Sequence, residues 1–166
     1  MLNQIIQRLT RMVKFDNTVY REIADDENAT TEAAIIVIVS SLLSAAGMAI
    51  RLGSVGTFLI QSVVGIAVGW LLWSYLAMLI GTRLFEGKAD FWQMARTIGY
   101  AYAPTAVGIL GLFSCIGSLI SLIASLLALA LGFFAVRETL GLSTEKAIIT
   151  VIIGWIVMAV VSFALL

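Results

Sequence analysis

The sequence predicts an all-α polytopic membrane protein, a bundle of five transmembrane helices with an N-terminal amphipathic interfacial helix. Three observations predict this class. Of the 166 residues, 61% are apolar and only 12% are charged, against the ~25% charge usual in a soluble domain. Five long stretches contain no charged residue, and nearly all of the Lys and Arg residues lie in alternate gaps between them. These features together exclude an ordinary soluble domain and a disordered chain.

Residues 1–32 are expected to form a cytoplasmic, amphipathic and charged segment ahead of the transmembrane domain, residues 33–166. Apolar residues recur from Leu2 to Val13 at the spacing of one helix face. Arg8, Arg11 and Lys14 fall on the other face, where we expect them to contact anionic lipid headgroups. The alternative is that the apolar face packs on the cytoplasmic end of the bundle.

The five uncharged stretches have the length of membrane-spanning helices. About 20 residues, in a range of roughly 17–25, cross the hydrocarbon core as a helix. The alternating pattern of a β-barrel strand is absent, and a continuous helix leaves no backbone polar group open to lipid. The predicted spans are about 33–50, 56–80, 97–113, 117–136 and 147–166.

The distribution of Lys and Arg predicts the orientation. With five spans and a cytoplasmic N-terminus, every Lys and Arg except Arg51 lies on the cytoplasmic side, as the positive-inside rule requires. The C-terminus then lies outside, and we expect the protein in a prokaryotic inner membrane.

The composition also argues against several classes of catalytic and metal-binding site. The chain has no His and a single Cys, Cys115, so the commonest general base and the commonest metal ligand are absent. No ionisable residue lies within a predicted span, which disfavours proton relays, ion-coupled transport and intramembrane catalysis. The charged loop around Glu86 and Lys88 is an ordinary connection. We therefore expect no enzyme activity, catalytic residue, metal or cofactor.

Small and aromatic residues mark candidate contacts inside the membrane. Gly65 and Gly69 form a G-x-x-x-G pair, which permits close helix approach. Trp70, Trp73 and Trp155 fall near the middles of their spans rather than at the interfaces that Trp favours. These residues either pack within the bundle or contact a partner helix or a lipid.

Pro104 lies in the middle of the third predicted span, and Tyr100 lies one turn before it. Proline removes a backbone donor and frees the carbonyl four residues earlier, so we expect a kink there. The kink is either a packing detail or a hinge that opens a groove the size of a lipid.

A family resemblance rests on this segment and on the loop before it. Residues 99–104, Gly-Tyr-Ala-Tyr-Ala-Pro, resemble the G-Y-x-x-x-P element of the Yip family, the Ypt/Rab-interacting membrane proteins. The loop with Gly81, Leu84, Gly87 and Phe91 is similar to the family's cytoplasmic loop. The resemblance spans roughly residues 20–166 and implies five spans, a cytoplasmic N-terminus and no catalytic residues.

The resemblance also bears on partners. Eukaryotic relatives bind prenylated Rab GTPases and pair with other membrane proteins, and they carry a long cytosolic arm with a D-L-W-G-P-like segment. This sequence has only residues 1–32 before the first predicted span, as in the short prokaryotic form, and no such segment, so we do not expect Rab-type binding.

The predicted role is a non-catalytic scaffold or accessory subunit that organises other membrane proteins or lipids. Membrane lipids, other membrane proteins or a second copy are the expected partners, and nucleic acid is not expected. The alternative is a small transporter or lipid-translocating protein.

Overall fold

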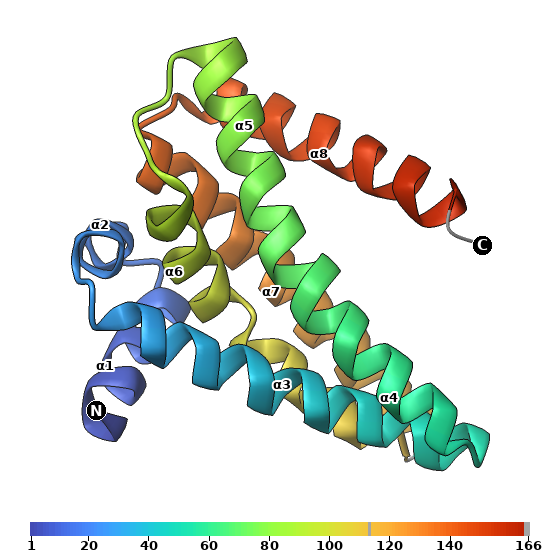
Figure 1. Ribbon diagram of the computed structural model, residues 1–166. Helices are drawn as coiled ribbons and strands as arrows, with labels where there is room; N and C mark the ends of the chain where they lie inside the picture. Colours follow the sequence, from blue (N-terminus) through green and yellow to red (C-terminus); the bar gives the residue numbers. More distant parts are fainter. Residues whose placement is uncertain (113, 165–166) are drawn as a thin grey trace.

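The computed structural model describes residues 1–112 and 114–164, with side chains outside 111–116 and 161–166. Every regular element among these residues is helical (Figure 1). The all-α class predicted from the sequence is confirmed.

Two short helices form the N-terminal region. α1 (Leu2–Val13) and α2 (Thr18–Asp25) are joined by a tight turn in which Phe15 takes a left-handed φ of 57°. Their apolar faces turn toward the bundle, and α2 packs against α6 (Phe91–Ala101) and α7 (Ser114–Leu140). Met12 is fully buried, so the structure agrees with docking on the bundle for this part of the apolar face. Leu2, Ile6 and Val13 remain exposed.

A long helical hairpin forms one side of the molecule. α3 (Ala29–Leu52) ends at Gly53, whose φ of 63° is the left-handed conformation that favours glycine at a helix end. Ser54 caps the return helix, which runs through α4 (Val55–Val64), the π-helix η1 (Gly65–Leu72) and α5 (Trp73–Phe85). Figure 1 shows the two arms of this hairpin lying side by side at its turn.

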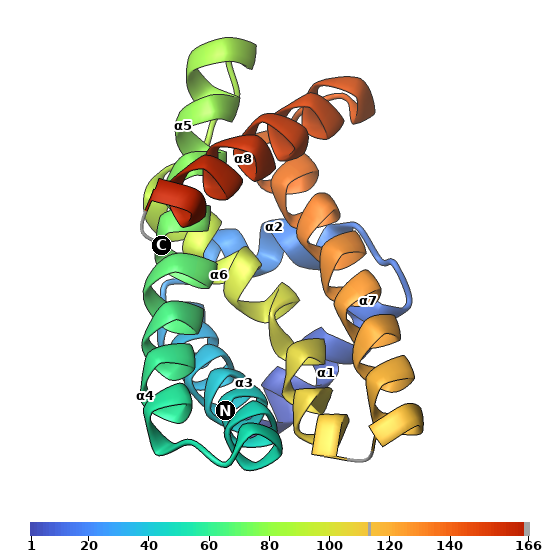
Figure 2. The same ribbon diagram turned by 90° about the vertical axis from the view of Figure 1, so that its right-hand side faces the viewer.

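The centre of the molecule is a broken helix. α6 begins at a capping box formed by Asp90 and Gln93 and gives way to the 3₁₀ helix η2 (Ala103–Leu112). Figure 2 shows this segment running between α3 and α7, and it contacts both helices.

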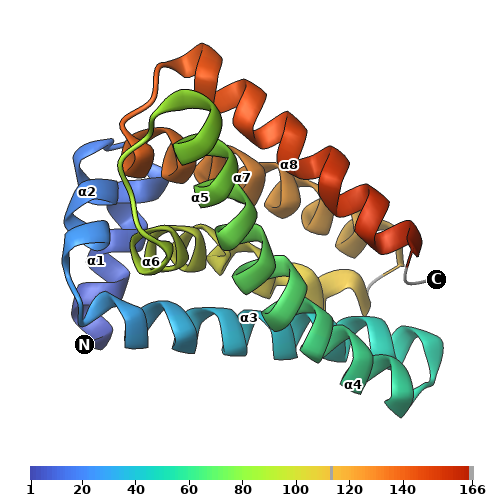
Figure 3. The same ribbon diagram turned by 45° about the horizontal axis from the view of Figure 1, so that its top comes forward.

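Two C-terminal helices complete the bundle. α7 runs beside α6 and η2, and α8 (Thr144–Ala164) returns along α5 and α7 (Figure 3). Ser143 caps α8, with its Oγ 3.5 Å from the Lys146 amide. The apolar faces of α4, α7 and α8 that turn away from the bundle are exposed, as expected for helices in contact with lipid.

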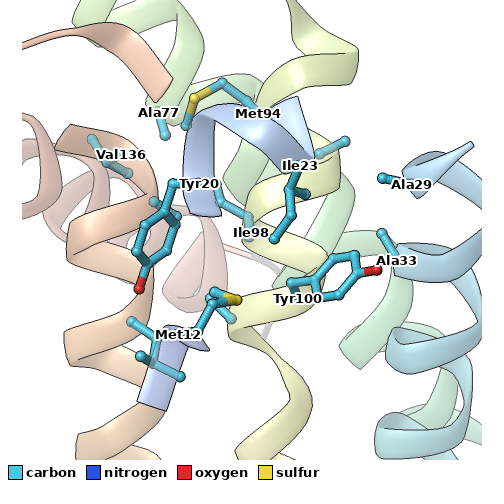
Figure 4. Packing of buried hydrophobic residues seen from close by; sticks show 14 of the residues in the cluster. Met12, Tyr20, Ile23, Ala29, Ala33, Ala77, Met94, Ile98, Tyr100 and Val136 are labelled. Carbon is cyan, nitrogen blue, oxygen red and sulfur yellow. The ribbon is translucent and has the colours of Figure 1, made fainter. Parts of the chain in front are cut away.

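The best-packed part of the core lies at one end of the bundle, where α1 and α2 meet α3, α6 and α7 (Figure 4). Tyr20, Tyr100 and Met12 are its largest fully buried side chains. The ring of Tyr20 stacks on Phe134 of α7, with centroids 6.4 Å apart. This core therefore joins the N-terminal helices to the bundle.

Three helical segments have the length and composition of membrane spans in the described residues: Ala29–Leu52, Val55–Phe85 and Gly117–Leu140. They correspond to the first, second and fourth predicted spans. The third, 97–113, begins inside α6 and is divided at Pro104, and Phe113 lies outside the described residues. The fifth, 147–166, matches α8 as far as Ala164. Five crossings and their orientation remain predictions.

Candidate functional site

The segment Gly99–Pro104 lies where α6 changes into η2, and its side chains reach two different regions. α6 ends at Ala101 because a residue before proline avoids the α conformation and Pro104 offers no donor. Thr105 repairs the break, since its amide and its hydroxyl both donate to the Tyr102 carbonyl, at 3.0 and 2.7 Å. The α-helix therefore gives way to a 3₁₀ helix next to Pro104, and the kink expected there remains a prediction.

Tyr100 points from the break toward a buried ionic cluster that joins four helices. Its hydroxyl donates to Glu32, in the first turn of α3. Arg8 of α1 donates to the same carboxylate at 2.7 Å and to Asp26 at 2.6 Å, and its third contact, with Glu22, is longer at 3.3 Å. The Arg8 and Glu32 side chains are each only 4% exposed. We call Arg8, Glu22, Asp26, Glu32 and Tyr100 the ionic cluster.

The pKa shifts of Asp26, Glu22 and Arg8 favour the charged form of each of these side chains. The hydrogen bond from Arg8 lowers the pKa of Asp26, and hydrogen bonds from Arg11 and Arg8 lower that of Glu22. Burial disfavours the charge on Arg8, but its hydrogen bonds outweigh burial and raise the pKa of the guanidinium. A buried arginine is stable here because each of its three nitrogens donates to a carboxylate.

The ionic cluster changes the expectation for the basic residues of α1. Arg8 was expected at the lipid headgroups, but the structure places it inside the protein, because the carboxylates of α2 and α3 converge on it. Arg11 pairs with Asp16 at 2.8 Å and Glu22 at 2.5 Å. Lys14 is exposed, and its contact with headgroups remains a prediction.

Gly99 allows three helices to meet at the same level. A Cβ on Gly99 would lie 2.7 Å from the Cβ of Ala33 on α3 and 3.0 Å from Nε1 of Trp70. The Trp70 side chain is buried, and its indole N–H donates to the Ala95 carbonyl at 2.7 Å. Trp70 therefore packs within the chain, and the Ala95 carbonyl provides the acceptor that a buried indole N–H needs.

Tyr102 points toward η1, whereas Tyr100 points toward the ionic cluster. Its hydroxyl donates to the Gly65 carbonyl at 3.3 Å, and a Cβ on Gly69 would collide with that hydroxyl. A Cβ on Gly65 would lie 2.9 Å from the Ser41 hydroxyl oxygen. The G-x-x-x-G pair therefore accommodates Tyr102 and α3 of the same chain.

An apolar groove of about 310 Å³ lies beside Tyr102, between η1, α5, α6, α7 and α8. We call it the lateral groove. Trp73 and Trp155 line it, together with Gly69, Ser125, Gly132 and Met158. Trp73 packs on Gly154 of α8, whereas Trp155 is 56% exposed at the rim. Of the predicted contact residues, Gly69, Trp73 and Trp155 thus share one groove, and Trp70 and Tyr100 do not line it.

Close packing explains the two glycines at the end of α5 and in the loop that follows it. Gly81 and Gly87 both contact the side chain of Leu140 at the end of α7, and the Gly87 amide donates to the Gly81 carbonyl at 3.0 Å. The Lys88 amide donates to the Leu140 carbonyl at 3.1 Å. These contacts fix the loop against the end of α7.

The ionic cluster and η1 were not found by sequence reasoning. No local pattern in the sequence connects Glu22, Asp26 and Glu32 with Arg8, and no local signal marks a π-helix. In the part of the chain that the structure describes, no group of three or more His, Cys, Asp or Glu residues could hold a metal ion.

In a comparison with known protein families, a family model described as the Yip1 domain matches residues 13–166, nearly the whole chain. No curated protein and no solved structure matches.

Proposed function

The chain belongs to the Yip family of membrane proteins, and from that premise we propose that it is a non-catalytic scaffold or accessory subunit that organises other membrane proteins or lipids. The lateral groove carries this proposal. It is lined mostly by apolar side chains, and its rim is exposed at Trp155, Ser125 and Leu129. A partner helix or an acyl chain matches such a lining, since neither brings a polar group that would need a partner.

The depth of the groove supports an occupant that comes from within the membrane. Trp155 follows the first residue of α8, Thr144, by three turns, which corresponds to about 16 Å at 1.5 Å per residue. With α8 as the fifth span, as the sequence predicts, this position is near the middle of a ~30 Å hydrocarbon core. A Trp exposed at that level can give a large, rigid contact surface to a neighbouring helix.

A filled groove is the sharpest test. A Cβ on Gly132 would meet no atom within 4 Å, so Gly132→Leu adds bulk to the groove without a clash at the backbone. The matched control is Leu122→Phe, which adds bulk on the exposed face of α7 outside the groove. Protein extracted in a mild detergent is purified and its co-purifying polypeptides and lipids are identified by mass spectrometry.

The native chain and Leu122→Phe are expected to retain a second membrane polypeptide, a second copy or a lipid, and Gly132→Leu to lose it. A native protein purified as a monodisperse single chain without a bound lipid would contradict the proposal. Retention of the same partner by Gly132→Leu would show that the groove is not the contact.

The second candidate is a small transporter or lipid-translocating protein, and the broken helix at Pro104 favours it. Discontinuous helices form the binding sites of many transporters, because freed backbone groups can contact a substrate. Cysteine scanning over residues 97–112, with Cys115 replaced by Ser, separates the two. A path through the membrane gives periodic labelling by a water-soluble reagent, and a packed scaffold gives none.

A further inference from the structure

A second cavity, which also borders Tyr102, differs from the lateral groove in being partly polar. It has a volume of about 160 Å³ and lies between α3, α4, η1 and η2. Its polar lining residues are Ser41, Ser44, Gln61, Tyr102 and Thr105. We call it the polar cavity. Tyr102 and Thr105 border both spaces.

One hydroxyl of the polar cavity has no partner. Ser41 is only 3% exposed, and its Oγ makes no hydrogen bond. The neighbouring hydroxyls differ: Ser44 donates to the Thr105 carbonyl at 2.5 Å, and Thr105 to the Tyr102 carbonyl at 2.7 Å. A buried hydroxyl without a hydrogen bond destabilises the folded protein by about 1–3 kcal/mol. A ligand that forms a hydrogen bond with Ser41 would remove this cost.

Irregular backbone forms two walls of the polar cavity. The π-helix η1 begins at Gly65, and the 3₁₀ helix η2 contributes Thr105. π-helical turns occur frequently at functional sites. In a membrane, such irregular backbone is tolerated where it is buried in protein or lines a polar space.

We propose that the polar cavity binds the hydroxyl-bearing glycerol head of an uncharged lipid, a monoacylglycerol or diacylglycerol. The ligand is uncharged because no Asp, Glu, Lys or Arg lines the cavity, and a phosphate there would be desolvated without a counter-charge. It carries a hydroxyl because that group both donates and accepts, which suits the Ser41 hydroxyl, the Gln61 amide and the Tyr102 oxygen.

The ligand comes from the bilayer because the polar cavity borders lipid-facing residues. Gln61 and Met48 line it and are exposed on α4 and α3. Gln61 follows the first residue of α4, Val55, by six residues, or about 9 Å along the helix. That level lies beneath the headgroup layer, where a glycerol without a phosphate can reside while its chain stays in the bilayer.

The test uses a monoacylglycerol that carries a photoactivatable diazirine near its head and an alkyne tag, added to the full chain in phosphatidylglycerol nanodiscs. Adducts are mapped by mass spectrometry. We expect them on residues 41–65, with competition by excess unlabelled diacylglycerol and none by the corresponding fatty acid, extra phosphatidylglycerol or free glycerol.

Two variants and a matched control locate the site. Ser41→Ala and Gln61→Leu are each expected to reduce the labelling of residues 41–65 about fivefold, as the loss of one neutral hydrogen bond predicts. Ser62→Ala is the control, because the Ser62 hydroxyl donates to the Phe58 carbonyl of its own helix at 2.8 Å and does not line the cavity. It is expected to label like the native chain.

Equal labelling of Ser41→Ala, Gln61→Leu and the native chain would overturn the proposal, as would adducts spread over the lipid-facing helices. Competition by free glycerol would also overturn it, because the site would then hold a small solute. Adduct formation at residues 41–65 is expected to be unaffected by Gly132→Leu, so this result is independent of the test of the lateral groove.

Discussion

Tyr100 and Tyr102 lie on either side of Ala101, yet their side chains belong to two regions of different character. Tyr100 is fully buried in the ionic cluster, where its hydroxyl is bound to Glu32 beside Arg8. Tyr102 is half-buried and lines both the lateral groove and the polar cavity, and its hydroxyl donates a hydrogen bond of 3.3 Å to the Gly65 carbonyl. One end of the bundle is thus closed by charged contacts, whereas in the middle Tyr102 borders both the lateral groove and the polar cavity.

The difference follows from what each environment demands. A charge excluded from water must be paired and hydrogen-bonded, so the charged end is filled by complementary groups from α1, α2, α3 and α6. In the middle of the bundle, glycines allow the helices to pack closely, and few polar contacts fix their positions. We infer that the charged end holds the fold together and that the middle is where the protein meets other molecules.

The largest expected effect comes from removing the cation at the closed end. Arg8→Ala leaves Glu32 buried without its partner, and breaking a buried pair in this way costs about 3–5 kcal/mol. The free energy of unfolding in detergent is measured with denaturant. Arg11→Ala is the matched control on the same helix, and it is expected to lose much less because Arg11 is more exposed. Equal losses would show that the cluster does not hold α1.

The second prediction compares the two tyrosines directly. Tyr100→Phe removes a hydrogen bond to a buried carboxylate and is expected to cost about 1.5–3 kcal/mol, whereas Tyr102→Phe removes a long bond to a carbonyl and is expected to cost about 0.5–1 kcal/mol. The same unfolding experiment measures both. A cost for Tyr102→Phe equal to that for Tyr100→Phe would remove the contrast between the regions.

The third prediction concerns glycines in the middle. Gly69→Ala is expected to cost about 1–3 kcal/mol, because its Cβ forces the Tyr102 hydroxyl to move. Gly132→Ala meets no atom and is expected to gain about 0.5–1 kcal/mol from the better helix propensity of alanine. Denaturant unfolding of both variants and the native chain gives the sign of each change in the free energy of unfolding. A lower free energy of unfolding for Gly132→Ala would mean that the lateral groove is already occupied by other atoms in the folded protein.

The smallest effect is a pH dependence at the closed end. Glu22 and Asp26 have pKa values lowered from 4.5 and 3.8 in the folded protein. Their contribution to stability is therefore complete above about pH 5 and is lost as the pH falls through the lowered values. Spin-label distances between α1 and α7 are expected to lengthen or broaden below pH 4. A Glu22→Gln, Asp26→Asn double variant is expected to lack this dependence, and a distance that shortens would contradict it.

Much of the fold could be predicted because it depends on local pattern. Uncharged stretches of helical length predicted the three helical segments that have the length and composition of membrane spans, and Pro104 predicted the break after Ala101. The ionic cluster could not be predicted in this way. Periodicity places Arg8 on the polar face of α1 but does not show that Glu22, Asp26 and Glu32 converge on it, since that depends on how α2 and α3 pack.

The candidate site was predicted in part for the same reason. Trp73, Trp155 and Gly69 were selected as unusual residues, but a sequence does not show that they line one groove. Trp70 was selected with them, yet the gap left by Gly99 turns it into a buried packing residue. The unpaired hydroxyl of Ser41 depends on where η1 starts, which no local pattern indicates.

Site-specific photo-crosslinking in native membranes compares the two regions in one measurement. A photoreactive residue replaces Trp155 in the lateral groove or Phe134 at the closed end. We predict that the Trp155 position captures a lipid or another membrane polypeptide, and that the Phe134 position captures the chain's own Phe15 or Tyr20, which it contacts. Capture of outside molecules as readily from Phe134 as from Trp155 would contradict the division into a closed end and an open middle.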